Sequence, residues 1–314
     1  MKKNSKVLSK KIDTKLISKL FHSKVSDINK NCGNIIKKYN LKYIEINSNE
    51  KLEIYKECVY YINKDNQKIA AKYRKKVWER GWGENLKDFI KNKSIKNLIP
   101  KYYTKKNLGI FRLGGKLIKS SNKNFEVKIL DIYRTWFFKK FFQKVDNIYE
   151  FGCGSGNNLF SASKIFPKKN IFGLDFVKTS VKLINLVGKK KNLKGFLFDM
   201  NKKNINFKIN NNSGFFSVGA LEQLNNNIDN ILNFFLIKKP IFCLNIEPDL
   251  YFYKSSIADK IAKKFQSKRG YTSNLIKKLK KLEREKKIKI IKIFRAPFGS
   301  LYIEGYNFIL WKVL

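Results

Sequence analysis

The chain has 314 residues, with 68 Lys plus Arg against 24 Asp plus Glu, a formal net charge of +44 and 43% hydrophobic residues. This apolar content excludes a disordered tail or a collagen-like repeat and suffices for one large core with a smaller satellite domain. The four cysteines form no C-x-x-C pair. A disulfide scaffold or zinc knuckle is therefore not predicted, and a reducing compartment fits.

The N-terminus resembles a membrane-targeting segment only in its first residues. Met1-Lys2-Lys3 could begin a signal peptide, but Lys10, Lys11 and further charges up to position 19 interrupt the apolar stretch that should follow. No uncharged apolar run approaches the roughly 18 residues that a membrane-spanning helix needs. We therefore expect a soluble, cytoplasmic protein without a transmembrane segment.

The strong positive charge has two interpretations. It could form a nucleic-acid footprint, because neutralising phosphates releases counterions. However, the basic residues are 61 Lys and only 7 Arg, as an AT-rich coding bias would produce, and specific phosphate and base recognition favours the bidentate guanidinium. Residues 211–250 also contain only Lys238 and Lys239 as basic groups. A solvated basic surface is favoured, and nucleic-acid binding stays open.

The first half of the chain shows mainly helical or irregular patterns. Residues 1–12 predict a disordered basic tail. From 13 to 73 the apolar residues recur at three- and four-residue spacing, which predicts short helices. The aromatic and glycine-containing stretch 77–86 is more typical of a loop with a helix start, and 100–128 of an irregular connection. Residues 129–142 have an apolar helical face that could dock against a sheet.

The pattern changes at Asn147 to alternating strands and helices, which indicates a parallel sheet with helices on both faces. The final two apolar runs, 288–294 and 306–313, have no helix between them and should pair antiparallel. The other predicted strands are 148–153, 171–176, 195–200, 214–220 and 241–246.

The strongest local motif is a strand running into a glycine-rich turn and a helix, at Tyr149-Glu150-Phe151-Gly152-Cys153-Gly154-Ser155-Gly156-Asn157. The glycines allow the backbone to pass close to a ligand without a Cβ in the way. A dinucleotide fingerprint would place its third glycine where Asn157 stands. The acid Glu150 would disfavour a pyrophosphate and favour a cationic amino-acid group. The alternative is a tight strand-to-helix turn without a ligand.

These residues resemble the class I S-adenosylmethionine-dependent methyltransferases over about residues 147–314. Asp175 follows the second strand, where the family keeps the acid that binds the ribose hydroxyls. Asp199-Met200 follows the third, like the pair that meets the adenine. Residues 217–223 close the fourth strand, where the family places methyl transfer. Three carboxylates at successive strand ends support the resemblance, because ligands of open α/β sheets bind at that edge.

The resemblance implies an α/β, Rossmann-like fold with a mostly parallel seven-stranded sheet and an antiparallel last strand, preceded by a mainly helical N-terminal region. It divides the chain into the tail 1–12, an accessory and acceptor-cover region 13–128, and a methyltransferase domain 129–314. It implies S-adenosylmethionine as the cofactor, and no residue cluster suggests a metal. The cofactor-binding candidates are Glu150, Gly152, Gly154, Gly156, Asn157, Asp175, Phe176, Asp199, Met200 and Gly219.

A general base is needed only if the acceptor loses a proton as it attacks. The single histidine, His22, lies in the N-terminal helical region, where packing or surface exposure explains it better than catalysis. Glu222, after the fourth strand, is the first candidate for the base. Glu247 and Tyr251, after the fifth, come next with Asp249. Each of them could equally be a solvated loop residue.

The N-terminal half should supply the acceptor pocket, with Arg112, Tyr102 and Tyr103 as substrate-binding candidates beside Trp78 and Trp82. This segment is expected to cover the site, with Gly81, Gly83, Gly114 and Gly115 as hinges; a helical brace on the outer face of the sheet is the alternative. Aromatic faces with one Arg suit a small-molecule or saccharide acceptor. Parts of the chain also resemble a little-characterised microbial subgroup associated with surface polysaccharides. An RNA methyltransferase or a basic nucleic-acid-binding protein with this fold is the rival reading.

Overall fold

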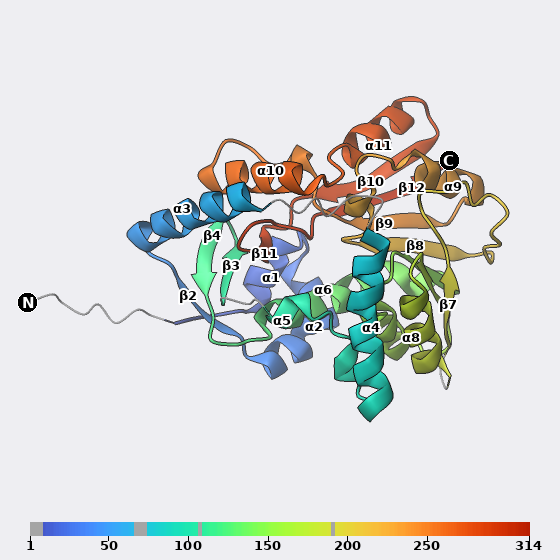
Figure 1. The fold of residues 1–314 in the computed structure, drawn as a ribbon, viewed down its shortest axis with the longest axis horizontal. Helices are drawn as coiled ribbons and strands as arrows, with labels where there is room; N and C mark the ends of the chain where they lie inside the picture. Colours follow the sequence, from blue (N-terminus) through green and yellow to red (C-terminus); the bar gives the residue numbers. More distant parts are fainter. Residues whose placement is uncertain (1–8, 66–73, 106–108, 190–191) are drawn as a thin grey trace, which may run out of the picture.

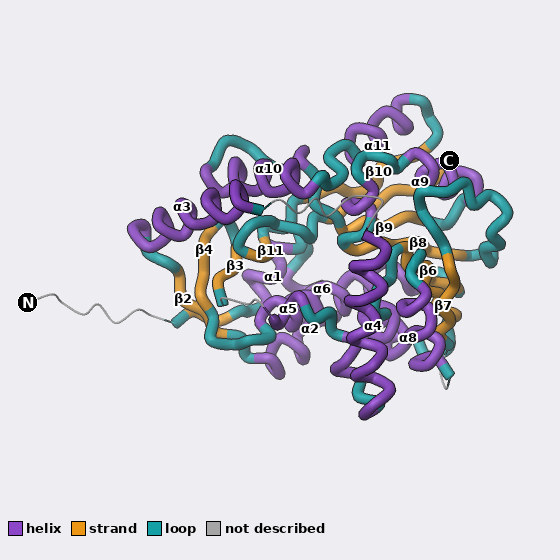
Figure 2. The backbone as a smooth tube through the Cα atoms, viewed as in Figure 1, coloured by secondary structure: helices purple, strands orange, loops and turns teal. Residues whose placement is uncertain are grey.

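The computed structural model describes residues 9–65, 74–105, 109–189 and 192–314. Within these ranges the strands form two sheets, one of seven strands and one of five. In Figure 1 the larger sheet lies on the right and the smaller one on the left, and helices surround both (Figure 2). Residues 1–8 of the predicted tail lie outside the described residues.

The larger sheet has the order β7-β6-β5-β8-β9-β12-β10. The strands β5 to β9 pair with one another in parallel. Strand β12 runs antiparallel to both β9 and β10. The prediction of a mostly parallel seven-stranded sheet with a reversed last strand is therefore confirmed. The strands are β5 (Asn147–Phe151), β6 (Asn170–Asp175), β7 (Leu193–Leu197), β8 (Ser213–Val218), β9 (Phe242–Ile246), β10 (Ile288–Phe294) and β12 (Phe308–Val313).

Helices cover both faces of this sheet because successive apolar side chains of each strand point to opposite sides. In β8, Phe216 joins the core under α6 and α7, and Phe215 joins the core under α9 and α11. The helices on the first face are α6 (Phe125–Phe141), α7 (Asn157–Ile165) and α8 (Lys178–Gly188), and those on the second are α9 (Asp229–Lys238) and α11 (Leu275–Arg284). No helix in the described ranges is both long and apolar enough to cross a bilayer.

The smaller sheet adds strands, not predicted from the sequence, to the mainly helical N-terminal region. Its order is β1-β2-β4-β3-β11, with every pair antiparallel. Strands β3 and β4 form a hairpin in the stretch predicted to be irregular. Gly114 and Gly115 form its two-residue turn, with φ of +59° and +81°, as a type I′ turn requires. They therefore belong to a fixed hairpin and do not act as hinges. The strands are β1 (Lys10–Lys11), β2 (Lys42–Glu45), β3 (Ile110–Leu113), β4 (Lys116–Lys119) and β11 (Phe298–Ser300).

Residues 10–12 are ordered, in contrast to the predicted tail. β1 pairs with β2, the Lys10 ammonium bonds to Glu45 at 2.6 Å, and Ile12 is buried in the core. A lysine-rich composition does not reveal this, because the partner strand lies some thirty residues further along the chain.

The two regions of the chain interleave. β11 comes from the C-terminal region but pairs with β3, and α10 (Ile257–Arg269) lies along α3 (Ser48–Lys64) in Figure 1. The remaining helices of the N-terminal half are α1 (Thr14–Leu20), α2 (Val25–Tyr39), α4 (Lys75–Asn92) and α5 (Tyr102–Lys105).

Helix α4 replaces the loop predicted over 77–86. Two glycines cost a helix roughly 1 kcal/mol each, so their presence argued against it locally. The tertiary structure compensates for this cost, because Trp82, Leu86 and Phe89 of α4 are buried and Glu79 bonds the first N–H groups of α8. A Cβ on Gly83 would make only an ordinary contact, 3.9 Å from a methyl carbon of α8. Both Gly81 and Gly83 are therefore helical positions and not hinges.

Candidate active site

A cavity of about 600 Å³ opens at the carboxyl ends of the parallel strands. This volume is within the usual range for small-molecule sites. All of the predicted cofactor residues line it except Gly156, which lies against Ile184 at the start of α7. The structure thus brings together residues that are up to 69 positions apart, from Glu150 to Gly219. The predicted cofactor residues in the cavity lining are Glu150, Gly152, Gly154, Asn157, Asp175, Phe176, Asp199, Met200 and Gly219. Other residues of the lining are Trp78, Trp82, Tyr102, Tyr103, Arg134, Asn158 and Gln223.

The glycine-rich turn between β5 and α7 requires glycine for two reasons. Gly152 and Gly154 have φ of +72° and +53°, which side chains with a Cβ disfavour. There is also no space for a Cβ: it would lie 2.5 Å from the Ala220 Cβ at Gly152 and 2.7 Å from the Trp82 ring at Gly154. The turn is therefore pressed between the end of β8 and helix α4.

Asp175 is built into this turn. Its Oδ2 accepts the Gly154 N–H at 2.8 Å and its Oδ1 accepts the Val177 N–H at 3.0 Å. Burial raises its pKa to about 6, in spite of these two donors. Each carboxylate oxygen has a further lone pair, so Asp175 can still accept two hydroxyl hydrogens from a ligand in the cavity.

Glu150 has one carboxylate oxygen without a partner. The side chain is only 1% exposed, its Oε1 accepts the Asn158 amide at 2.6 Å, and its Oε2 is unpartnered among the described residues. Burial raises its pKa to about 8. An unpaired buried carboxyl oxygen is costly, and it would be stabilised by a cationic ligand group.

Arg134 on α6 complements Glu150 in the same cavity. Its guanidinium contacts Asn158 Oδ1 at 3.2 Å and Asp131 Oδ1 at 3.3 Å. Its buried Nε has no partner within the described part of the chain. Arg134 and Glu150 both bond Asn158, and each keeps one atom without a partner among the described residues. This cation and anion match the two charges of an amino-acid zwitterion. Arg134 and Asn158 were not predicted, because a single Arg on an apolar helix and an Asn after the motif give no pattern.

Helix α4 lies beside α8 (Figure 1), and its residues Trp78 and Trp82 line the cavity. Glu79 accepts hydrogen bonds from the Lys178 and Thr179 N–H groups at 2.8 and 3.1 Å, and so caps the start of α8, where a negative charge is favourable. Trp78 and Trp82 stack with ring centroids 5.4 Å apart, and Ser155 in the glycine turn donates to Leu98 O at 2.6 Å. The segment therefore forms part of the cavity wall, and its role as an acceptor cover stays a prediction.

Of the predicted substrate residues, Tyr102 and Tyr103 line the cavity and Arg112 does not. Arg112 is 2% exposed in β3, and its Nε donates to Leu301 O at 3.0 Å. It lies inside the smaller sheet because β3 pairs on both sides, with β4 and β11.

The predicted catalytic residues are not part of the cavity lining. Glu247 is fully buried and accepts the Ser217 hydroxyl at 2.7 Å and the N–H groups of residues 220 to 222 at 3.1–3.2 Å. It thus fixes the start of the short helix η4 (Leu221–Leu224). Tyr251 is 56% exposed and bonds Lys280. Neither lines the cavity.

Glu222 lies next to the cavity-lining Gln223, and its Oε1 accepts the Gln223 amide at 2.8 Å. Burial and then the neighbouring Glu247 carboxylate hold the pKa of Glu222 well above its usual value. The Glu222 side chain itself is not part of the described lining.

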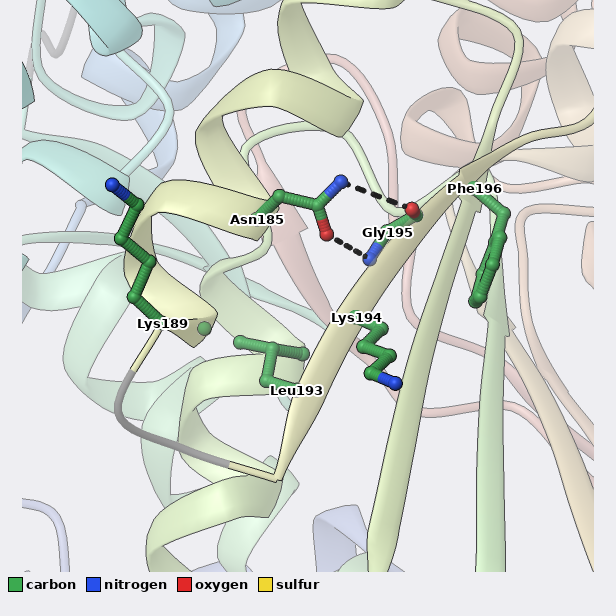
Figure 3. Close-up of a pocket in the computed structure, with 7 residues that line it drawn as sticks. Asn185, Lys189, Leu193, Lys194, Gly195 and Phe196 are labelled. Atoms are coloured by element: carbon green, nitrogen blue, oxygen red, sulfur yellow. Dashed lines mark hydrogen bonds between the residues drawn. The ribbon is translucent and has the colours of Figure 1, made fainter.

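A second depression, of about 440 Å³, lies beside the edge strand β7 (Figure 3). There the Asn185 side chain accepts the Gly195 N–H at 2.8 Å and donates to the Gly195 carbonyl at 3.2 Å. These bonds satisfy backbone groups that an edge strand leaves open. The described residues that line it include no carboxylate, histidine or thiol, which favours a structural role.

No family model matches the sequence, and no curated protein matches it significantly. Among solved structures, the chain is similar to a magnesium protoporphyrin IX methyltransferase from Synechocystis with bound S-adenosylhomocysteine (9% identity, 61% of this chain and 85% of that chain, TM-score 0.44). It is also similar to a geranyl diphosphate C-methyltransferase from Streptomyces coelicolor (11%, 62% and 85%, 0.46) and to a 16S rRNA methylase (16%, 74% and 98%, 0.42).

Proposed function

We propose that the protein transfers a methyl group from S-adenosylmethionine to a small-molecule or saccharide acceptor. The observation that carries this proposal is the single cavity at the strand ends, in which Glu150, Asp175 and Asp199 lie around the glycine turn. Ligands of open α/β sheets bind at this edge. The cofactor would supply an activated methyl group on a sulfonium, which is already a good leaving group.

The charged and polar groups of the cavity fit the parts of this cofactor. Glu150 Oε2 and Arg134 Nε, which have no partner among the described residues, suit the ammonium and carboxylate of its amino-acid part. Asp175 suits the ribose hydroxyls, and Asp199 with Met200 suits the adenine. The chain then contributes positioning, because holding the acceptor in line with the leaving group accounts for much of the rate in such a transfer.

The aromatic lining of the cavity supports a small acceptor. Trp78, Trp82, Tyr102 and Tyr103 line it, and aromatic faces pack well against the apolar faces of sugars and other small rings. Helix α4 lies across the glycine turn, so the acceptor has to fit beneath it. A small ring satisfies that requirement more easily than a folded RNA does.

Titration calorimetry with S-adenosylmethionine tests the cofactor assignment. We expect saturable binding by the wild-type chain. Binding should be weaker in Arg134→Gln by roughly 10-fold or more, since a charge-assisted hydrogen bond contributes about 1.5–3 kcal/mol. Arg284→Gln, on α11 outside the cavity lining, is the matched control and should bind like the wild type. Absence of binding by the wild type would refute the proposal.

Transfer of a labelled methyl group to a panel of glycosides, phenols, amines and total RNA tests the acceptor class. We expect label in a small-molecule pool. Label in RNA alone would establish the rival function.

A further inference from the structure

Three flat side chains form a ladder along helix α4, on the face that lines the cavity. Arg74, Trp78 and Trp82 follow one another at intervals of four residues, which places them on the same side of a helix. The Arg74 guanidinium carbon lies 5.5 Å from the centre of the Trp78 ring. The Trp78 and Trp82 ring centroids are 5.4 Å apart, with 16° between the ring planes. All three side chains line the cavity.

The ladder places Arg74 away from the glycine-rich turn. Trp82 packs on this turn, because a Cβ on Gly154 would lie 2.7 Å from its ring. Arg74 is the N-cap residue of α4, with φ of −80° and ψ of −3°. A helix rises 1.5 Å per residue, so the step from Trp82 back to Arg74 spans about 12 Å. Arg74 therefore lies two side-chain layers beyond the turn.

The Arg74 guanidinium lacks a partner that a buried cation needs. Its Nε is buried and has no hydrogen-bond partner among the described residues. The carboxylate that acts on it electrostatically, Asp65, forms an ion pair with Arg269. Burial is the main cause that lowers the pKa of Arg74, so its charge is not fully compensated. A buried donor of a charged group is costly to leave unpaired, and an anionic ligand would satisfy it.

The carboxyl group of Glu222, beside the cavity, does not supply this anion. Its Oε1 accepts the Gln223 amide at 2.8 Å, and Glu222 is not part of the lining. Burial and then the neighbouring Glu247 carboxylate raise the pKa of Glu222 well above its usual value, so it is uncharged near neutral pH. It holds Gln223, whose buried Oε1 has no partner within the described ranges. This oxygen can accept a hydrogen bond from a ligand hydroxyl.

The charges around the cavity indicate where a second anion belongs. S-adenosylmethionine would bring an ammonium, a sulfonium and one carboxylate, and Arg134 already suits that carboxylate. A second arginine is not needed by the cofactor and would repel its sulfonium. The charge of Arg74 is therefore left for the acceptor. In the described lining the basic side chains are Arg74, Lys75, Arg134 and Lys202, and the acidic ones are Glu150, Asp175 and Asp199.

We propose that the methyl acceptor carries an anionic group, a carboxylate or a phosphate, which Arg74 binds beyond the glycine-rich turn. This inference rests on the proposed function and names the class of its acceptor. Stacking on Trp78 fixes the plane of the guanidinium, and this planar group matches two oxygens of a carboxylate or phosphate. Lys75, next to Arg74 in the lining, adds a second positive charge. An acidic sugar combines such an anion with hydroxyl groups that Gln223 can bind.

The first test observes Arg74 directly, by nitrogen–proton correlation spectroscopy of the arginine Nε–H groups in the presence of S-adenosylhomocysteine. The chain has only 7 Arg, and Arg74→Lys identifies the Arg74 signal by removing it. We expect D-glucuronate, D-glucose 6-phosphate or both to shift this signal to saturation, and neutral D-glucose to leave it unchanged. A shift with only one of the two anions separates carboxylate from phosphate recognition.

This readout does not depend on turnover. If neither anion shifts the Arg74 signal to saturation, or if D-glucose shifts it equally, the proposal is overturned.

The second test measures methyl transfer to two acceptors that differ in charge, phenyl glucuronide and phenyl glucoside. The wild-type KM should be lower for the glucuronide by roughly 10-fold or more, because a charge-assisted hydrogen bond is added. Arg74→Gln should lose this preference, with a larger effect on KM than on kcat and with unchanged cofactor affinity. Arg80→Gln is the matched control, since Arg80 is exposed on the same helix outside the lining, and it should keep the preference.

The outcomes separate this inference from the proposed function. Failure of the wild type to bind S-adenosylmethionine refutes the proposed function and the anionic acceptor together, and so does label in RNA alone. Cofactor binding with equal KM values for the two glycosides, or a preference that survives in Arg74→Gln, refutes the role of Arg74 alone.

Discussion

Substitution of Glu150 by Gln is expected to have opposite effects on the free protein and on cofactor binding. Glu150 is buried, its Oε1 bonds Asn158 and its Oε2 has no partner in the described structure. Gln keeps the shape and the oxygen that accepts from Asn158, and it removes the charge. The free protein should therefore become more stable at alkaline pH, and the complex should become weaker.

The magnitude for the free protein follows from the raised pKa. Burial moves the pKa of Glu150 from 4.5 to about 8 in the folded state. The folded state thus holds the proton more tightly than the unfolded state, so the free energy of unfolding falls as the pH rises from about 4.5 to about 8 and is level above that. At about 1.36 kcal/mol per pH unit and proton, this is at most on the order of 5 kcal/mol. Glu150→Gln should remove this dependence.

The magnitude for the complex follows from the unpartnered oxygen. The ligand ammonium loses a charge-assisted hydrogen bond of about 1.5–3 kcal/mol, which weakens binding roughly 10- to 200-fold. Denaturant unfolding at pH 5 to 9 measures the first effect, and calorimetry with S-adenosylmethionine measures the second. Proton release on binding, from calorimetry in two buffers, should fall in the variant because Glu150 no longer ionises. Wild-type affinity combined with an unchanged pH dependence of stability would refute the reasoning.

Three further substitutions test the construction of the site. Asp175→Ala leaves the Gly154 and Val177 N–H groups without their acceptor, so both thermal stability and cofactor affinity should fall, by roughly 1–3 kcal/mol for each lost bond. A normal affinity would show that this carboxylate does not bind the ligand. Gly154→Ala places a Cβ 2.7 Å from the Trp82 ring at a φ of +53° and should lower the free energy of unfolding by at least about 1–2 kcal/mol. The control Gly305→Ala, where a Cβ has nothing within 4 Å, should be close to neutral. Equal effects of the two substitutions would contradict the packing argument. Glu79→Gln removes the charge at the start of α8 and should cost about 0.3–1 kcal/mol in chemical unfolding, with the exposed Glu53→Gln as the control that should show no comparable loss.

The sequence alone determined the larger sheet and the side of the cavity that the strand ends form. Both depend on local order: apolar strands alternate with helices, and the glycines and carboxylates follow strand ends directly. In a parallel sheet all these ends meet at one edge, so position along the chain is enough to place Glu150, Asp175 and Asp199 together. The reversed last strand followed in the same way from two apolar runs without a helix between them.

The side of the cavity that the N-terminal half forms was decided by tertiary structure. Helix α4 forms against local propensity because its side chains Trp82, Leu86 and Phe89 are buried and its Glu79 bonds the start of α8. Arg112 lies away from the cavity, because β3 pairs within a second sheet that includes β11, a strand nearly 190 residues later in the chain. Contacts over such separations leave no periodic pattern in the sequence.

The same reason explains which polar residues were missed. Arg134 lies on the apolar helix α6, and Asn158 lies in the first turn of α7. Each is unremarkable in sequence and becomes a candidate only beside its partner. The charge and hydrogen-bonding state of a buried group depend on its neighbours in space, and these are fixed only when the chain has folded.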